Sequence, residues 1–394
     1  MPTATVGVQR QFTAQGNASF EGFINLTTDG QYLVFAGYDA ALGTPVPAEG
    51  NASVINRVVG RIDATGNVDT STALTDWSNG TAGSAASARS VISTDGVTFL
   101  LAGAQGGVRQ TTLGSTTSTN VATPLDNLRH IDLFGSQLFA STGITTGAPS
   151  VIQSVDTVGG VTSSLPGVPP AGSGGANVID VAQFFMADLS TEVAGVDTLY
   201  IADSRSQTNG GGLRKFSLEA GTWVARGGVF YVGAPPAGEP SVSILRGLTG
   251  VVDGSNVTMY AIRNANTIQS FVDTSGYAGT MTGVATNLAT APANTLWKGL
   301  DFVPVVSPGG IPGDFNNDTF VDGLDLAQWK GDFGVNDDDS DADDDGDSDG
   351  QDFLIWQRNL TGGVGGAAAI PEPSAAVLGL IVAAAFALRR QSSF

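Results

Sequence analysis

Two twelve-residue stretches near the end of the sequence carry oxygen-bearing side chains at the same five positions. Calcium binds six to eight oxygen atoms, and loops of this length supply them from positions one, three, five, nine and twelve, with a backbone carbonyl at seven. The side chains at these positions are Asp314, Asn316, Asp318, Asp322 and Asp325 in the first stretch, and Asp341, Asp343, Asp345, Asp349 and Asp352 in the second. Phe320 and Asp347 stand at position seven. The spacing predicts two calcium sites.

Residues 311–360 contain fifteen aspartates against two basic residues. The alternative to two calcium sites is therefore that this segment is a solvated acidic tract. Every predicted ligand is displaced by 27 residues between the two stretches, and Trp329 and Trp356 share this displacement. Such a repeat favours calcium over an unstructured tract. Because the carboxylates repel one another, folding of this segment should depend on the ion.

One helix-like segment follows each loop, and no helix is expected before it. This loop–helix duplication resembles the type I dockerin family. The resemblance implies a small α-helical domain over residues 314–360 that binds two Ca²⁺ ions and docks onto a cohesin-like partner. Residues 305–313 form a Pro/Gly linker before it, and residues 361–370 form a Gly/Ala linker after it.

The last segment, residues 371–394, begins with Pro371, Glu372 and Pro373. A fourteen-residue apolar run follows, and then the pair Arg389 and Arg390. As a helix the run would rise about 21 Å, less than a bilayer core of about 30 Å. The arrangement resembles the PEP-CTERM sorting signal, which implies a short apolar helix inserted transiently in the membrane and processing by an exosortase-type enzyme.

Such a signal implies export to the cell envelope or extracellular matrix of a Gram-negative bacterium. Export requires a signal peptide, yet the sequence begins with neither a basic region nor an apolar one. We therefore expect that the true N-terminus lies upstream of Met1.

Composition excludes several kinds of chemistry. The chain of 394 residues has a net charge of −20, no cysteine and a single histidine, His130. A thiolate nucleophile, a disulfide framework, a Ser–His–Asp triad and a multi-histidine zinc site are therefore disfavoured. Nucleic acid is not an expected partner, because its phosphates would be repelled.

Residues 1–304 read as β-structure throughout, with short apolar runs between Gly, Asp, Asn and Ser clusters. A Thr-Asp-Gly turn followed by a strand occurs at residues 28–37 and again at 94–103, and looser copies follow. Repeats of this size predict a β-propeller of six or seven blades. Blades should start near residues 22, 88, 128, 179 and 245, with a further strand near 297. A large β-sandwich or a β-helix remains an alternative.

Four basic residues stand at similar places just before the expected inner strands of four repeats: Arg89, Arg129, Arg246 and Lys298. Around a central channel they would form a positive ring able to bind an anionic ligand. The alternative is a structural role, in which they pair with nearby aspartates or backbone carbonyls. The carboxylates Asp132, Asp180, Asp203 and Asp301 lie near strands, but nothing in the sequence pairs any two of them, and His130 is expected to be structural.

These observations favour an exported, surface-sorted binding or scaffold protein without catalytic residues, attached through a calcium-dependent module. Extracellular polysaccharide is a candidate partner. The alternative is a secreted carbohydrate-active enzyme that cleaves glycosidic bonds. Two carboxylates converging in the body would favour the enzyme, and a cation-lined axis without such a pair would favour binding.

Overall fold

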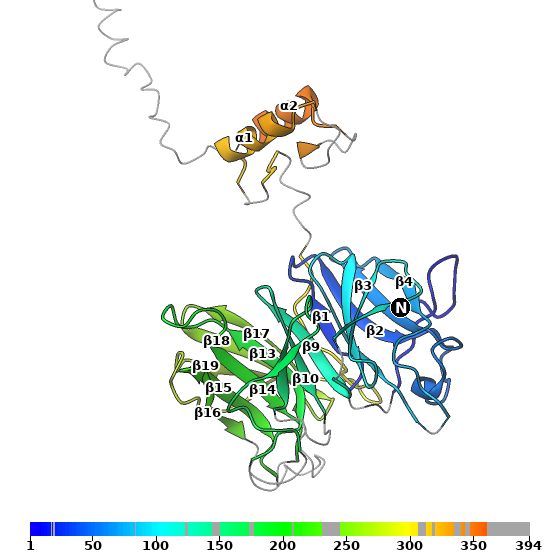
Figure 1. The fold of residues 1–394 in the computed structure, drawn as a ribbon, viewed down its shortest axis with the longest axis vertical. Helices are drawn as coiled ribbons and strands as arrows, with labels where there is room; N and C mark the ends of the chain where they lie inside the picture. Colours follow the sequence, from blue (N-terminus) through cyan, green and yellow to red (C-terminus); the bar gives the residue numbers. More distant parts are fainter. Residues whose placement is uncertain are drawn as a thin grey trace, which may run out of the picture. The chain divides into compact units, whose positions relative to one another are not determined.

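The computed structural model describes residues 1–360, apart from residues 17, 19, 83, 123–124, 144–149, 173–176, 207–208, 231–244, 306–312, 317–319, 335–339 and 343–346. The chain divides into two compact units, Met1–Val306 and Ser307–Phe394. Each unit is described by itself (Figure 1).

The first unit is a β-propeller with five four-stranded blades among its described residues (Figure 1). Every blade is an antiparallel meander in which consecutive strands pair. Blade 1 contains β1 (Ile24–Leu26), β2 (Tyr32–Tyr38), β3 (Arg57–Asp63) and β4 (Val68–Leu74), with the 3-10 helix η1 (Pro47–Glu49) before β3. Blade 2 contains β5 (Ala88–Ser93), β6 (Thr98–Gly103), β7 (Val108–Thr112) and β8 (Thr119–Ala122).

The remaining blades repeat this plan. Blade 3 contains β9 (Leu128–Phe134), β10 (Gln137–Thr142), β11 (Ile152–Val155) and β12 (Thr162–Ser164). Blade 4 contains β13 (Val181–Ala187), β14 (Thr198–Asp203), β15 (Gly212–Glu219) and β16 (Thr222–Phe230). Blade 5 contains β17 (Leu245–Asp253), β18 (Asn256–Arg263), β19 (Thr267–Asp273) and β20 (Thr286–Thr290).

Asp-Gly turns join the first strand to the second in blades 1, 2 and 5, as the sequence repeat predicts. Blade 3 uses Gly135 and Ser136 instead, and blade 4 uses a longer connection, residues 188–197. In blade 2, Asp95 Oδ1 accepts hydrogen bonds from the backbone N–H groups of Val97 and Thr98. The following Gly96 has φ of 70°, and the equivalent Gly30 in blade 1 has φ of 75°. Glycine adopts this left-handed conformation without strain, so the turn chemistry fixes where the first strands of blades 1 and 2 end.

The first strands of the blades lie on the inside of the propeller. Asn25 on β1 shows this directly, because its side-chain amide donates to the carbonyls of Val91 on β5 and Ile131 on β9. Three inner strands thus meet at one side chain. The inner strands begin at residues 24, 88, 128, 181 and 245, within two residues of the five predicted starts.

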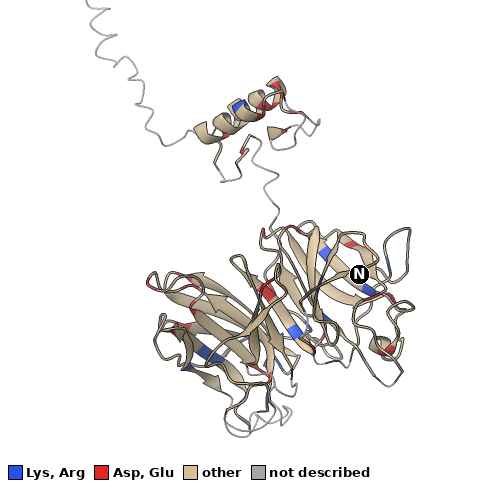
Figure 2. Ribbon diagram, in the orientation of Figure 1, with Lys and Arg blue, Asp and Glu red and all other residues tan. Residues whose placement is uncertain are grey.

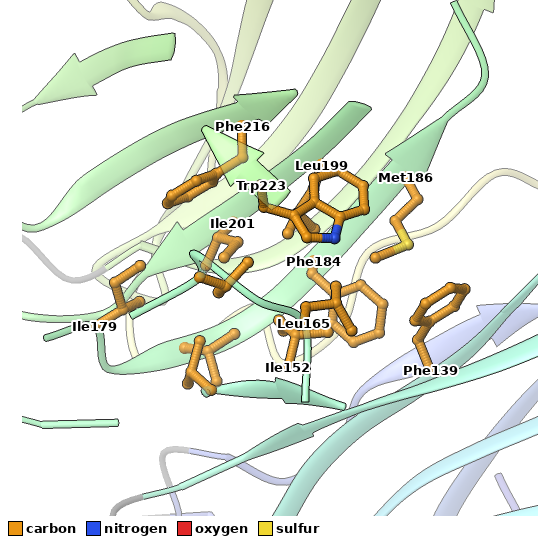
Figure 3. Close-up of a cluster of buried hydrophobic side chains, with 13 residues drawn as sticks. Phe139, Ile152, Leu165, Ile179, Phe184, Met186, Leu199, Ile201, Phe216 and Trp223 are labelled. Carbon is orange, nitrogen blue, oxygen red and sulfur yellow. The ribbon is translucent and has the colours of Figure 1, made fainter. Parts of the chain in front are cut away.

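Apolar side chains fill four of the joints between neighbouring blades. The joint between blades 3 and 4 is one example, with Phe139 and Ile152 facing Phe184, Leu199 and Trp223 from the next blade (Figure 3). Comparable clusters join blades 1 and 2, blades 2 and 3, and blades 4 and 5. Within the described residues, no such cluster joins blade 5 to blade 1.

Residues 297–305, which we call the closing segment, connect blade 5 to blade 1. Asp301 in this segment accepts from the backbone N–H of Leu26 at 2.6 Å and from the hydroxyl of Thr249 at 2.7 Å. The same segment places Phe302 edge-on against Tyr260 of blade 5, with ring centroids 5.9 Å apart. One carboxylate therefore ties the last inner strand to the first.

The predicted number of six or seven blades is wrong, because five blades are described. The error comes from the apolar residues around Trp297, which the sequence suggests as a further inner strand. In the structure these residues form the closing segment and no strand is described there. The backbone N–H of Trp297 instead donates to Ala265 O, in the turn between β18 and β19.

The second unit contains two short helices in its described residues, α1 (Gly323–Asp332) and α2 (Gly350–Asn359). Both helices begin with the same capping arrangement. The side chain of Asp322 accepts from the backbone N–H of Leu324, and Asp325 accepts from the backbone N–H of Asp322. Asp349 and Asp352 repeat this arrangement in α2.

The two helices are linked by a reciprocal exchange of hydrogen bonds. Trp329 Nε1 on α1 donates to Asp349 O at 2.9 Å, and Trp356 Nε1 on α2 donates to Asp322 O at 2.8 Å. Each indole thus binds the residue that caps the other helix. Phe353 lies between the indoles, with ring centroids 5.1 Å and 5.5 Å away.

The predicted dockerin-type helical domain and apolar C-terminal helix are not supported. Residues 314–360 show two ten-residue helices and no wider helical domain in their described part. The predicted apolar helix, with residues 361–394, lies outside the described residues. Among the helices that are described, none is long and apolar enough to span a bilayer.

Candidate functional site: a cation cluster at the start of the inner strands

Arg89, Arg129 and Arg246 occupy the second position of the inner strands β5, β9 and β17. Because these strands are the first strands of their blades, the second residue of each lies toward the same end of the propeller. Lys298, the fourth predicted cation, lies at the start of the closing segment. Nine further basic residues occur in residues 1–306, and Figure 2 shows blue segments at several places on the propeller ribbon. We call Arg89, Arg129, Arg246 and Lys298 the cation cluster.

Two of these arginines follow a common rule, in which each binds the first residue of the next inner strand. Arg89 donates to Leu128 O at 2.9 Å and to Asn127 Oδ1 at 2.8 Å. Arg129 donates to Val181 O at 2.6 Å and to the carboxylate of Asp180 at 2.5 Å. These contacts match the structural alternative given by the sequence, since an aspartate and backbone carbonyls are the partners.

Two residues before β1 contact the cation cluster. Lys298 Nζ donates to Ala18 O at 2.5 Å, and two residues later the ring of Phe20 lies 3.6 Å from the guanidinium carbon of Arg129. Glu21 follows directly and is 3% exposed. The phenol of Tyr38 donates to the Glu21 carboxylate at 3.0 Å.

Burial and mutual repulsion shape the protonation of the cation cluster. Burial, followed by the charge of Arg129, lowers the pKa of Arg89 to about 10. The pKa values of Arg246 and Lys298 are lowered first by burial and then by the charges of Arg129 and Arg246, respectively. Burial raises the pKa of Glu21, although Arg89 and Lys298 oppose this shift. The cations therefore form one electrostatically coupled group with Glu21.

A pair of carboxylates lies further along the inner strands. Asp132 is the fifth residue of β9, and Asp301 contacts Thr249, the fifth residue of β17. Burial and the charge of Asp301 raise the pKa of Asp132 to about 8. Burial also raises the pKa of Asp301. At neutral pH, Asp132 is therefore protonated beside a second acidic group.

The single histidine is part of the core. His130 is 1% exposed, and its Nε2 binds Asn25 Oδ1 at 3.0 Å between the rings of Phe23 and Phe184. Burial lowers its pKa to about 3, so the ring is neutral. A buried neutral imidazole held in this way acts as a structural residue, as the sequence suggests.

The other two aspartates in the predicted set are occupied by arginines. Asp180 pairs with Arg129, as described above. Asp203 is fully buried and binds Arg205 at 2.8 Å and Arg214 at 2.7 Å. These ion pairs stabilise blade 4 and the joint that precedes it.

The predicted calcium ligands are described in part. Asp318, Asp343 and Asp345 lie outside the described residues, and no group of three metal-binding side chains is found among those that are described. Asp325 and Asp352 are each fully buried at the twelfth position of their loop. Asp325 accepts from the backbone N–H groups of Asn316 and Asp322, and Asp352 accepts from those of Ala342 and Asp349. The sorting-signal residues Pro371, Glu372, Pro373, Arg389 and Arg390 lie beyond the described part.

Sequence reasoning missed two features of this region. Glu21 precedes the first inner strand and carries no repeat signature that would mark it as a partner of the cations. The pairing of Asp132 with Asp301 depends on closure of the ring between residues 169 positions apart. Neither feature leaves a local pattern in the sequence.

A search with models of known protein families and a search of curated proteins found no match. The chain is similar to the periplasmic gluconolactonase PpgL of Pseudomonas aeruginosa, with 14% identity over 70% of this chain and 73% of that one, at a TM-score of 0.42. A GH74 enzyme of Niastella koreensis has 13% identity, covering 71% and 40% of the two chains at a TM-score of 0.42. TolB of Acinetobacter baumannii has 13% identity, covering 70% and 55%, at a TM-score of 0.40.

Proposed function

We propose that this chain is an exported binding protein in which a propeller is the binding body and two calcium-dependent loops form the second unit. Export rests on the sorting-signal resemblance of residues 371–394. The observation that supports calcium is the burial of Asp325 and Asp352, two carboxylates at equivalent places in the repeat.

A buried, ionised carboxylate needs hydrogen-bond donors or a nearby positive charge to offset the loss of its hydration. In the described part of the second unit, the hydrogen-bond donors to Asp325 and Asp352 are backbone N–H groups, and neither carboxylate pairs with a described lysine or arginine. Leaving such a charge without a counter-ion costs roughly several kcal/mol in a protein interior. Each carboxylate oxygen has a further lone pair that can bind a cation. The donor set therefore fits Ca²⁺, which prefers hard oxygen ligands.

The ion would be held by the six predicted residues of each loop, with Phe320 and Asp347 contributing backbone oxygens. A bound ion supplies positive charge that lets the loop carboxylates approach one another. The caps of α1 and α2 share these residues, since Asp322 and Asp349 are also predicted ligands. We therefore expect calcium to stabilise both helices together.

Isothermal titration calorimetry of the full chain with CaCl₂ tests this proposal. We expect two sites in the wild type, one in Asp325→Asn and none in the Asp325→Asn/Asp352→Asn double variant. The matched control Asp332→Asn lies at the end of α1, outside the predicted ligand positions, and should keep both sites. Absence of heat at millimolar calcium, together with a far-UV spectrum unaffected by a chelator, would overturn the proposal.

The carboxylate pair supports a second candidate, a hydrolase acting on glycosidic bonds. A protonated Asp132 beside Asp301 provides the acid and the second carboxyl group that such chemistry needs. Both oxygens of Asp301, however, already accept from Leu26 and Thr249. Release of reducing sugar from acidic and neutral polysaccharides, lost in Asp132→Asn, would favour the enzyme. No release by the wild type would leave binding as the function of the propeller.

A further inference from the structure

A small cavity, which we call the blade 1 cavity, lies at the outer strands of blade 1. It has a volume of about 240 Å³, and six of its lining side chains are polar: Gln9, Tyr32, Arg61, Asp63, Asn67 and Asp69. Each of the six is at least partly exposed, so the cavity is accessible from solvent. Sites for drug-sized molecules have roughly 300–1,000 Å³, so this cavity suits a single small ring.

Arg61 and Asp69 face each other across β3 and β4 without forming a hydrogen bond. They are register partners, yet Arg61 Nη2 and Asp69 Oδ2 lie 3.9 Å apart, beyond the length of about 2.7–3.2 Å for an N–H···O bond. Arg61 is fixed by its bond to Gly96 O at 2.9 Å, and Asp69 uses its other oxygen for Ser71 N. A hydroxyl group between the two side chains could accept from Arg61 and donate to Asp69.

Two amide side chains add a further donor and a further acceptor at fixed positions. Gln9 Oε1 accepts from the backbone N–H and the hydroxyl of Thr70, at 2.6 Å and 3.2 Å, which leaves its NH₂ group for a ligand. Asn67 Nδ2 donates to Asp63 and to Thr65, which leaves its Oδ1 as an acceptor. Groups that are already ordered lose little conformational freedom when a ligand binds.

The charges at the blade 1 cavity favour a neutral ligand. Hydrogen bonds, first that from the Thr65 side chain, lower the pKa of Asp63 to about 2, so this carboxylate is ionised at neutral pH. Asp63 and Asp69 therefore outweigh Arg61 by one negative charge, which disfavours a phosphate or carboxylate ligand. A metal ion is also disfavoured, because both oxygens of Asp63 already accept hydrogen bonds and a guanidinium lines the same cavity.

Blade 3 shows that the fold does not require the charged residues Arg61 and Asp69. The turn between β11 and β12 also begins with an aspartate, Asp156, which accepts from two backbone N–H groups. The register partners that stand there in place of Arg61 and Asp69 are Ser154 and Ser163. The turn therefore forms without the charged pair, and the pair is free to serve a ligand.

We propose that the blade 1 cavity binds one sugar residue of a neutral polysaccharide. Each hydroxyl group of a sugar both donates and accepts, which matches the mixture of donors and acceptors at this cavity. One hydroxyl bridges Arg61 and Asp69, and others bind the NH₂ group of Gln9 and the Oδ1 atom of Asn67. This inference rests on the proposed binding role of the propeller and names the class of its ligand.

Ligand-observed NMR of the full chain in saturating calcium tests the proposal, with the methyl glycosides of glucose, galactose and mannose as separate probes. Sodium glucuronate is the anionic comparison, and acetamide is the comparison for peptide groups. We expect saturation transfer to at least one glycoside, less to glucuronate and none to acetamide. Raising the salt concentration should change the glycoside affinity little, because the ligand carries no charge. Transfer to acetamide alone would indicate a peptide partner and overturn the inference.

Asp69→Asn is the most informative variant, because it exchanges one acceptor oxygen for a donor and can keep the bond to Ser71 N. Arg61→Met removes the donor on the opposite side of the bridging hydroxyl. Each variant should weaken glycoside binding roughly tenfold or more, because each loses a hydrogen bond to a charged group. Asp156→Asn makes the matched change in blade 3, outside the cavity, and should bind like the wild type.

Two results would overturn the site. One is no transfer to any of the three glycosides by the wild type, and the other is equal affinity in Asp69→Asn, Arg61→Met and the wild type. In the second case the propeller would still bind sugar at another place, so its binding role would survive without this cavity. Calcium titration of the same samples tests the second unit separately.

Discussion

Asp132 should make the propeller less stable as pH rises, and replacing it should remove this dependence. Burial and Asp301 raise its pKa from 3.8 to about 8. Between these values the folded protein keeps the proton and the unfolded chain releases it. The stabilising contribution is therefore complete below pH 4 and is lost progressively up to about pH 8.

The magnitude follows from the size of the shift. Each pKa unit corresponds to about 1.4 kcal/mol, so at pH 7 the folded state is disfavoured by about 4 kcal/mol relative to low pH. The amide of an Asp132→Asn variant would carry no such penalty and could still accept the hydrogen bond that Leu133 N donates to Asp132 Oδ1 at 2.8 Å. For a unit of about 300 residues, 4 kcal/mol corresponds to roughly 6 °C in the unfolding midpoint.

The assay is differential scanning calorimetry of the propeller transition between pH 4 and pH 9. We expect Asp132→Asn to unfold several degrees above the wild type at pH 7–8 and to converge with it near pH 4. Asp253→Asn, at the exposed end of β17, is the control and should follow the wild type. Parallel curves for Asp132→Asn and the wild type would refute the reasoning, because they would show that Asp132 is ionised in the folded protein.

Three further substitutions probe other parts of the fold. Lys215→Met should destabilise the propeller by about 3–5 kcal/mol in urea unfolding, because it leaves the buried carboxylate of Asp273 without its cation; a loss below about 1 kcal/mol would contradict a buried ion pair. Trp356→Phe should cost the second unit about 1 kcal/mol through loss of the bond to Asp322 O, seen as a lower midpoint of the helical signal in circular dichroism. Phe12→Ala should lower the propeller stability by about 2 kcal/mol, since its ring packs on blade 1, and an unchanged thermal midpoint would argue against that contact.

Local patterns in the sequence predict much of the propeller. The Thr-Asp-Gly repeats correctly mark the turns at Gly30 and Gly96, because glycine is needed there for backbone reasons that a sequence displays. The same patterns locate the inner strands. They fail near Trp297, where an apolar run that resembles a strand becomes the closing segment, because the difference depends on which partners are available in space.

The cation cluster shows the same limit. Position in the repeat identifies Arg89, Arg129 and Arg246 as equivalent residues, since they share the second place in their inner strands. It does not reveal that Glu21 stands among them. For the predicted calcium loops, the spacing of the oxygen-bearing residues is itself the signal, and the structure adds the burial of Asp325.

The joint between blade 5 and blade 1 has a mechanical consequence. Four joints are apolar interfaces, whereas this one is held in the described structure by the closing segment and a few polar contacts around Asp301. A propeller in which one joint between blades lacks an apolar interface behaves in part like a linear row of blades with two ends. A force that opens the propeller should therefore act first at this joint, so that blades 1 and 5 separate before any of the other four pairs of adjacent blades.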